Sequence, residues 1–206
     1  MKNAPKNLEY PEFFRPGLGT ENVAPFLRAF VQMVRPSRIL EVGAGYTTPF
    51  FLEALYNNQR VFNDGNLNQN FLSTEKYDPK LIVIDDLSLG EITTNHHMKS
   101  VMSSDYVKFV HGVFQGKAQE LKKEYGLFDF VWFDCGSAKE YAEFLDEYWS
   151  ICNGYIIFHY TYSDGRPNKN MEVLEKFLDD GFPVFSIVEP HKKRQGSISI
   201  VKKQKI

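Results

Sequence analysis

The sequence has little cysteine and no long apolar run. Only Cys135 and Cys152 are present in the 206 residues, which excludes a disulfide framework and a zinc site built from thiolates. The longest apolar runs, such as 81–84, are too short to cross a bilayer. Residues 1–5 also lack the apolar stretch of a secretory signal. We therefore expect a cytoplasmic protein with no membrane partner.

The chain also lacks an excess of positive charge. It has 24 Lys and Arg against 26 Asp and Glu, a net charge of −2 with histidine neutral. Six basic residues and no acid lie in 190–206, so residues 1–189 carry −8, which is the −2 of the whole chain less these six. Nucleic-acid binding depends on neutralisation of phosphate by Lys and Arg. We therefore expect a small-molecule partner and no nucleic acid; a homodimer is also compatible with this composition.

Length and composition fit one domain over residues 1–206, with 43% hydrophobic residues. Residues 1–36 are expected to form an irregular arm, whose aromatic side chains pack on the body or over a site, followed by a helix that ends before Pro36. Residues 57–79 are polar and rich in Asn and Asp, which indicates an insertion or a long loop.

Short apolar segments alternate with segments of helical periodicity along the rest of the chain. This alternation predicts a mostly parallel sheet with helices on both faces, followed by an antiparallel hairpin near the C-terminus. The expected strands are 38–42, 81–84, 107–110, 128–133, 155–158, 184–188 and 197–201, and the expected helices begin near 47–48 or cover 89–104, 118–125, 139–149 and 170–180.

Polar residues follow several of these strands at their carboxyl ends, where parallel sheets bind ligands. The first strand contains Glu41 and runs into Gly43-Ala44-Gly45, a turn that lets a ligand approach the backbone. A dinucleotide fingerprint would need a third glycine at position 48, where the chain has Thr48. A glycine turn that binds no ligand is the alternative interpretation.

Acids and a histidine follow the later strands. Asp85 follows the second strand, and a carboxylate there can accept hydrogen bonds from both hydroxyls of a ribose. Asp134 follows the fourth strand and His159 ends the fifth. His159 is the first candidate for a proton acceptor, because the pKa of histidine lies near neutrality, and Asp134 is the second. A hydrogen-bonded structural histidine is the alternative.

The stretch Glu41-Val42-Gly43-Ala44-Gly45 resembles the acid-x-Gly-x-Gly loop of class I S-adenosylmethionine-dependent methyltransferases. Residues 128–137 and 154–160 resemble the fourth and fifth strands of small-molecule O-methyltransferases of the catechol-type branch. The resemblance covers roughly 37–160. It implies a Rossmann-like α/β fold with a seven-stranded mixed sheet, helices on both faces and a C-terminal antiparallel hairpin, and it implies methyl transfer from S-adenosylmethionine to oxygen or nitrogen.

The resemblance also implies a set of cofactor-binding residues. The cofactor would lie across Gly43, Ala44 and Gly45, with Glu41 near its amino-acid end and Asp85 on its ribose. Phe114 would either stack on the adenine or fill the core. The implied cofactor-binding residues are Glu41, Gly43, Ala44, Gly45, Thr47, Asp85, Val113, Phe114 and Asp134.

The chain departs from the catechol-type pattern at two positions. Ala138 stands where that branch has a histidine, and Tyr160 stands where it often has an aspartate. A divalent metal needs several oxygen ligands together, so no metal is expected. Three alternatives stay open: an aminopropyl-type transferase with the same loop, a nicotinamide-dependent oxidoreductase, and a non-catalytic protein that keeps the fold.

Overall fold

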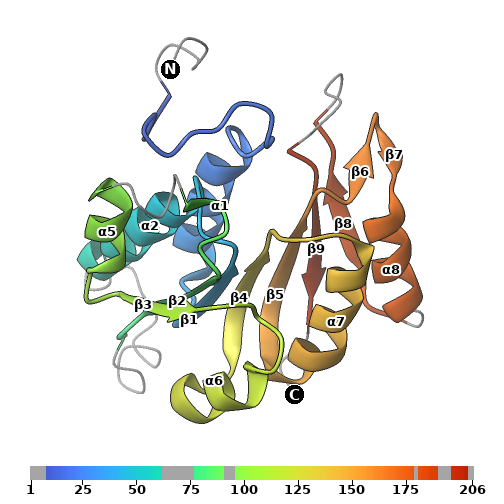
Figure 1. Ribbon diagram of the computed structural model, residues 1–206. Helices are drawn as coiled ribbons and strands as arrows, with labels where there is room; N and C mark the ends of the chain where they lie inside the picture. Colours follow the sequence, from blue (N-terminus) through green and yellow to red (C-terminus); the bar gives the residue numbers. More distant parts are fainter. Residues whose placement is uncertain (1–7, 62–76, 91–95, 179–180, 190–195, 204–206) are drawn as a thin grey trace.

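A seven-stranded sheet with the order β3-β2-β1-β4-β5-β9-β8 forms the centre of the molecule (Figure 1). The structure is a computed structural model, and it describes residues 8–61, 77–90, 96–178, 181–189 and 196–203. The first five strands of the chain are parallel, while β9 runs antiparallel to both β5 and β8. This arrangement confirms the mixed sheet and the C-terminal hairpin, which β8 and β9 form.

The strands coincide closely with the apolar segments of the sequence. Most residues of the central strands are buried because helices cover both faces, which is why these strands are apolar runs without alternation. The bounds are β1 Arg38–Val42, β2 Lys80–Asp85, β3 Val107–His111, β4 Phe128–Phe133, β5 Cys152–His159, β8 Val184–Ile187 and β9 Ile198–Lys202.

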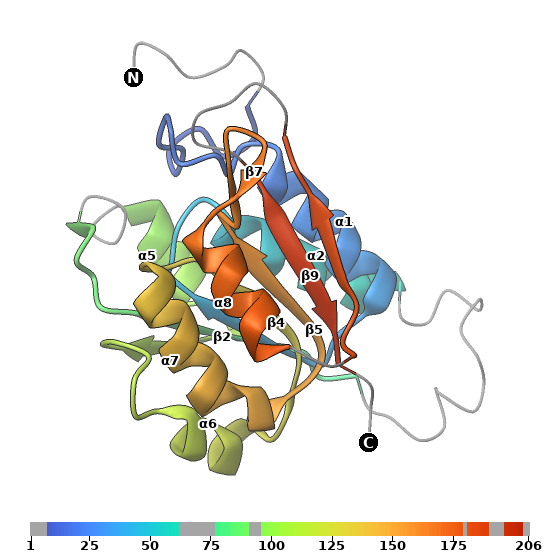
Figure 2. The same ribbon diagram turned by 90° about the vertical axis from the view of Figure 1, so that its right-hand side faces the viewer.

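Within the described residues, helices lie on both faces of the sheet (Figures 1 and 2). One face carries α1 Val23–Val34, α2 Thr48–Val61 and α5 His96–Met102, and the other carries α6 Ala118–Tyr125, α7 Ala138–Tyr148 and α8 Lys169–Phe177. A single 3₁₀ turn, η1 Trp149–Ile151, follows α7. Each face buries its own apolar cluster, so the sheet has a separate core on either side.

The helix expected over 89–104 is described as α5 His96–Met102, and its residues 91–95 lie outside the described residues. Two other segments differ from the sequence-based expectation. Residues 57–61 are the last part of α2 and not a loop, whereas residues 62–76 of the expected insertion lie outside the described residues. Asn58 is buried and its side-chain amide donates to the Val31 carbonyl, so a polar residue type there reflects a buried hydrogen bond and not solvent exposure.

The second difference is a small hairpin after β5, formed by β6 Tyr162–Ser163 and β7 Arg166–Pro167. Asp164 and Gly165 connect the two strands, both with positive φ, at 50° and 72°. An Asp-Gly pair is a strong sequence signal for such a turn. The sequence therefore indicates this hairpin, although the expected strands did not include it.

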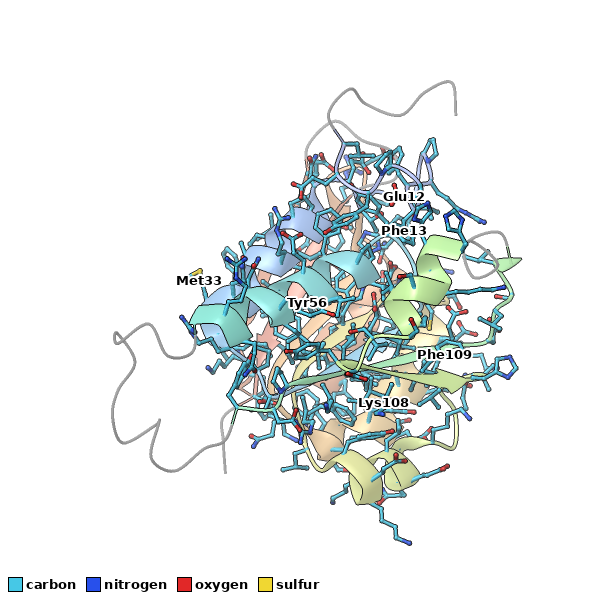
Figure 3. All side chains as sticks on the ribbon, turned by 90° about the vertical axis from the view of Figure 1, so that its left-hand side faces the viewer. Glu12, Phe13, Met33, Tyr56, Lys108 and Phe109 are labelled. Carbon is cyan, nitrogen blue, oxygen red and sulfur yellow. The ribbon has the colours of Figure 1, made fainter. Side chains whose placement is uncertain are left out.

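The arm packs its aromatic side chains on α2 and α5, as the sequence suggested. Phe13, Tyr46, Phe50 and Met98 share one buried cluster, and Figure 3 shows Phe13 beside α5. Tyr10 Oη donates a 2.9 Å hydrogen bond to Glu53 of α2. No helix in the described ranges is long and apolar enough to cross a membrane.

Candidate active site

A cavity of about 660 Å³ lies at the carboxyl ends of β1, β2, β3 and β4. The chain adds β2 and β3 on one side of β1, and β4 and β5 on the other. This reversal makes the gap between β1 and β4 the topological switch point, where open α/β sheets bind their ligands. The volume falls within the range of about 300–1,000 Å³ that is usual for small-molecule sites.

The turn after β1 forms one wall of this cavity and depends on glycine. Gly43 has φ +98°, and a Cβ built on it would lie 2.7 Å from the Asp134 carbonyl oxygen, far inside the contact distance. Gly43 therefore lets β1 and β4 approach each other. Gly45 has no atom within 4 Å of such a Cβ, so this part of the turn is open. Gly43, Ala44 and Gly45 all line the cavity.

Asp85 joins the end of β2 to this turn. The Ala44 amide donates to Asp85 Oδ2 at 2.8 Å, and the Leu87 amide donates to Oδ1 at 2.7 Å. Each carboxylate oxygen can accept a further hydrogen bond, and Asp85 lines the cavity. Its neighbour Asp86 also lines the cavity and is exposed.

Glu41 and Thr47 lie beneath the turn and are not part of the cavity wall. Both are buried, and Thr47 Oγ1 donates to Glu41 Oε1 at 2.5 Å. Burial raises the pKa of the Glu41 carboxyl to about 8, although the hydroxyls of Thr47 and Thr48 lower it and the charges of Asp134 and Asp85 add to the rise. In this structure Glu41, the acid of the loop motif, stabilises the turn through its buried hydrogen bond with Thr47.

Asp134 and His159 form a hydrogen-bonded pair at the ends of β4 and β5. His159 Nδ1 lies 2.7 Å from Asp134 Oδ1. The His159 side chain is only 4% exposed and packs on the Trp132 ring, whereas the Asp134 side chain is 30% exposed and lines the cavity. The sequence analysis ranked His159 before Asp134 as a proton acceptor. In the structure Asp134 reaches the cavity, and His159 lies behind Asp134.

The segment after β3 supplies another wall. Val113 is 55% exposed, while Phe114 is 4% exposed and contacts the rings of Phe133, Phe144 and Tyr148. Both residues line the cavity. Phe114 therefore has a core role and borders the cavity, so the two alternatives left open for it do not exclude each other.

Residues far apart in the sequence complete the wall. Phe13, Leu18 and Thr20 come from the arm, and Ser88 and Leu89 come from the segment after β2. The arm and this segment meet where Arg15 Nη2 donates to the Leu89 carbonyl at 3.4 Å. The cavity-lining residues that the sequence analysis did not assign are Phe13, Leu18, Thr20, Val42, Tyr46, Ile84, Asp86, Ser88, Leu89, Gly112, Gln115, Cys135, Gly136, Ser137 and Glu140.

The two positions that depart from the catechol-type pattern have structural roles. Ala138 begins α7. Tyr160 has φ +53°, and its carbonyl accepts hydrogen bonds from the side-chain amides of Asn168 and Asn170 at 2.8 and 3.0 Å. Among the residues that the structure describes, no group of three His, Cys, Asp or Glu side chains could hold a metal ion.

The chain has a Rossmann-like fold that it shares with solved O-methyltransferase structures. No family model and no curated protein matches its sequence, but solved structures match its fold. An O-methyltransferase from Bacillus cereus in complex with S-adenosylhomocysteine aligns with 96% of this chain and 85% of its own, at TM-score 0.63 and 15% identity.

Two further structures show the same likeness. An O-methyltransferase from Streptomyces achromogenes involved in tomaymycin synthesis, in complex with S-adenosylmethionine, aligns with 92% of this chain and 83% of its own, at TM-score 0.64 and 13% identity. A methyltransferase from Podospora anserina bound to S-adenosylhomocysteine aligns with 91% and 80%, at TM-score 0.54 and 17% identity. At sequence identities this low, the comparison shows a shared fold and nothing further.

Proposed function

We propose that this chain is an S-adenosylmethionine-dependent methyltransferase that methylates an oxygen or nitrogen atom of a small molecule. The observation that carries the proposal is the hydrogen bond between the Ala44 amide and Asp85 in the cavity wall. It joins the glycine turn of β1 to the acid of β2, the two features that the sequence resemblance assigns to the cofactor. The fold supports it, because similar structures include complexes with S-adenosylmethionine and S-adenosylhomocysteine.

The residues of the cavity suit the chemical groups of this cofactor. Asp85 and Asp86 offer carboxylate oxygens to the two ribose hydroxyls, which are hydrogen-bond donors. The open backbone at Gly45 leaves room beside the turn. Val113 and Phe114 offer apolar surface to the adenine. When bound, the cofactor supplies an activated methyl group on a sulfonium ion.

In this proposal Asp134 is the catalytic residue and His159 is a positioning residue. The acceptor atom must lose a proton as it gains the methyl group, and Asp134 is the exposed member of the pair. With its proton on Nδ1, His159 donates to Asp134 Oδ1 and holds the carboxylate at the cavity. The Tyr141 hydroxyl donates to the His159 carbonyl and fixes the end of β5.

The arm would exclude water from the site. Phe13 is 3% exposed and lines the cavity together with Leu18. Apolar side chains at this wall lower the local dielectric constant, which strengthens the interactions of the carboxylates within. The same side chains would help to align the acceptor, and alignment contributes much of the rate in such reactions.

Calorimetric titration with S-adenosylmethionine, S-adenosylhomocysteine and NAD tests the cofactor. We expect both adenosyl compounds to bind, and Gly43→Val to abolish the binding. Binding of NAD alone would contradict the proposal and favour an oxidoreductase. Analysis of the product separates methyl transfer from aminopropyl transfer, and binding without turnover of any acceptor would favour a non-catalytic protein.

An acceptor is first sought by measuring the release of S-adenosylhomocysteine. The pH dependence of turnover then tests the roles of Asp134 and His159. Asp134→Asn should lower kcat by about 10²–10⁴-fold, the usual contribution of a general base, while the cofactor still binds. His159→Leu should shift the pH profile of kcat. His159→Asn keeps an N–H donor, so its pH profile should lie closer to that of the wild type. An unchanged profile in His159→Leu would refute the positioning role.

A further inference from the structure

The charge of the cavity wall has one sign. The described wall residues include four acids and no Lys, Arg or His side chain. The acids are Asp85, Asp86, Asp134 and Glu140. They come from the ends of β2 and β4 and from the first turn of α7, so they lie on different sides of the cavity and not in a single loop.

Local hydrogen bonds keep two of these acids ionised. The hydroxyl and amide of Ser88 donate to Asp86, and the hydroxyl and amide of Ser137 donate to Glu140. These bonds lower the pKa of Asp86 and of Glu140 below their ordinary values. Both carboxylates are therefore negative at neutral pH, and a small molecule that enters the cavity meets this charge.

The rest of the wall near the arm is apolar. Phe13 and Leu18 belong to the arm, and Leu89 follows β2. The guanidinium of Arg15 bonds the Leu89 carbonyl between these two segments, and Arg15 is not among the wall residues. The wall thus combines apolar side chains with carboxylates and offers an anion no cationic side chain from the described residues.

We propose that the acceptor is an amine with an apolar body, which is a cation at neutral pH. This inference rests on the proposed function and specifies its substrate class. Carboxylates attract an ammonium group and repel carboxylates and phosphates, and this repulsion is a common source of specificity. The apolar body of the acceptor would contact Phe13, Leu18 and Leu89. We expect phosphorylated and carboxylated acceptors to bind more weakly because of the same charges.

Binding of three matched compounds tests the proposal, with S-adenosylhomocysteine first bound to the full chain. The compounds are 2-phenylethylamine, 2-phenylethanol and phenylacetate, which share a ring and differ in charge. We expect the amine to bind at least about tenfold more tightly than the carboxylate, a ratio that corresponds to ~1.4 kcal/mol, with the alcohol between them. The preference should weaken as salt is added.

Variants of the wall sharpen the test. Glu140→Gln should reduce the ratio of amine to carboxylate affinity, while Glu120→Gln, an exposed acid of α6 outside the cavity wall, should leave the ratio unchanged. Equal or reversed affinities, or no binding of the amine at millimolar concentration, would overturn the inference. If S-adenosylhomocysteine itself does not bind, the proposed function fails instead.

Discussion

The Ala44 amide donates a 2.8 Å hydrogen bond to Asp85 Oδ2 and so joins the turn after β1 to the end of β2. The two residues are 41 positions apart in the chain. The same carboxylate accepts a hydrogen bond from Leu87 through its other oxygen. Asp85 therefore shapes the cavity wall in addition to any contact that it makes with a ligand.

Replacement of Asp85 should weaken cofactor binding. Asp85→Ala removes the acceptor of the Ala44 amide and the carboxylate offered to the ribose, so we expect the affinity for S-adenosylhomocysteine to fall by about tenfold or more. Calorimetry measures this change. Asp86→Asn, which keeps an acceptor for the Ser88 amide, is the control and should have the smaller effect. The reverse order would assign the ribose to Asp86.

Replacement of Gly43 should destabilise the fold. In Gly43→Ala the new Cβ would meet the Asp134 carbonyl oxygen at 2.7 Å in a backbone with φ +98°. Strain of this kind costs about 1–3 kcal/mol, which urea unfolding can measure. Gly45→Ala is the matched control, because no atom lies within 4 Å of its Cβ. Equal losses of stability in the two variants would contradict the role given to Gly43.

The pKa of Glu41 makes a pH-dependent contribution to stability. Burial raises this pKa from 4.5 to about 8, so between these values the folded chain keeps a proton that the unfolded chain releases. The free energy of unfolding therefore falls as the pH rises across this window. Glu41→Gln removes the titration while keeping an acceptor for Thr47, and its stability should fall less.

Urea unfolding at about pH 5 and about pH 8 measures the stability of the wild type and of Glu41→Gln across this window. Each unit of pKa shift corresponds to about 1.4 kcal/mol. Glu120→Gln, at an exposed position, serves as the control and should follow the wild-type curve. If Glu41→Gln also follows the wild-type curve, the raised pKa of Glu41 is refuted.

Removal of the Phe13 ring should loosen the arm. Phe13 is 3% exposed in a cluster with Tyr46 and Phe50, and a Phe→Ala change at a buried position costs about 3–5 kcal/mol. We expect faster proteolysis within the described part of the arm, measured by mass spectrometry of the fragments. Met33→Ala, at a side chain that is 81% exposed, should change neither stability nor cleavage. Unchanged cleavage in Phe13→Ala would argue against a docked arm.

Local patterns predicted most of the fold. The run 128–133 forms β4, and the periodic segment 118–125 forms α6. A strand buried on both faces is apolar throughout, whereas a helix buried on one side has apolar residues at helical spacing, so both can be recognised from the sequence. Residues 57–61 were assigned to a loop because they are polar, yet Asn58 is buried through hydrogen bonds that depend on Val31 and Tyr77. Such partners are distant in sequence, so composition does not reveal them.

The sequence places several candidate residues at strand ends, but it does not give the burial of their side chains. Gly43, Asp85 and Asp134 meet at one cavity because they follow parallel strands. The burial of His159 behind Asp134 and of Glu41 beneath the turn depends on packing between strands, which spacing along the chain does not encode. The cytoplasmic location, the homodimer and the roles of the individual site residues stay predictions.

The central position of β1 and β4 has a consequence for the folding kinetics. These two strands pair along their whole overlap, from Ile39 with Phe130 to Val42 with Phe133. At the start of β1, the amides of Ser37 and Arg38 donate to the Asp129 carboxylate. Contacts between segments about ninety positions apart form slowly, because a long loop must first close. We therefore expect the cavity, whose wall includes Asp134 after β4, to be complete only once β1 and β4 have paired.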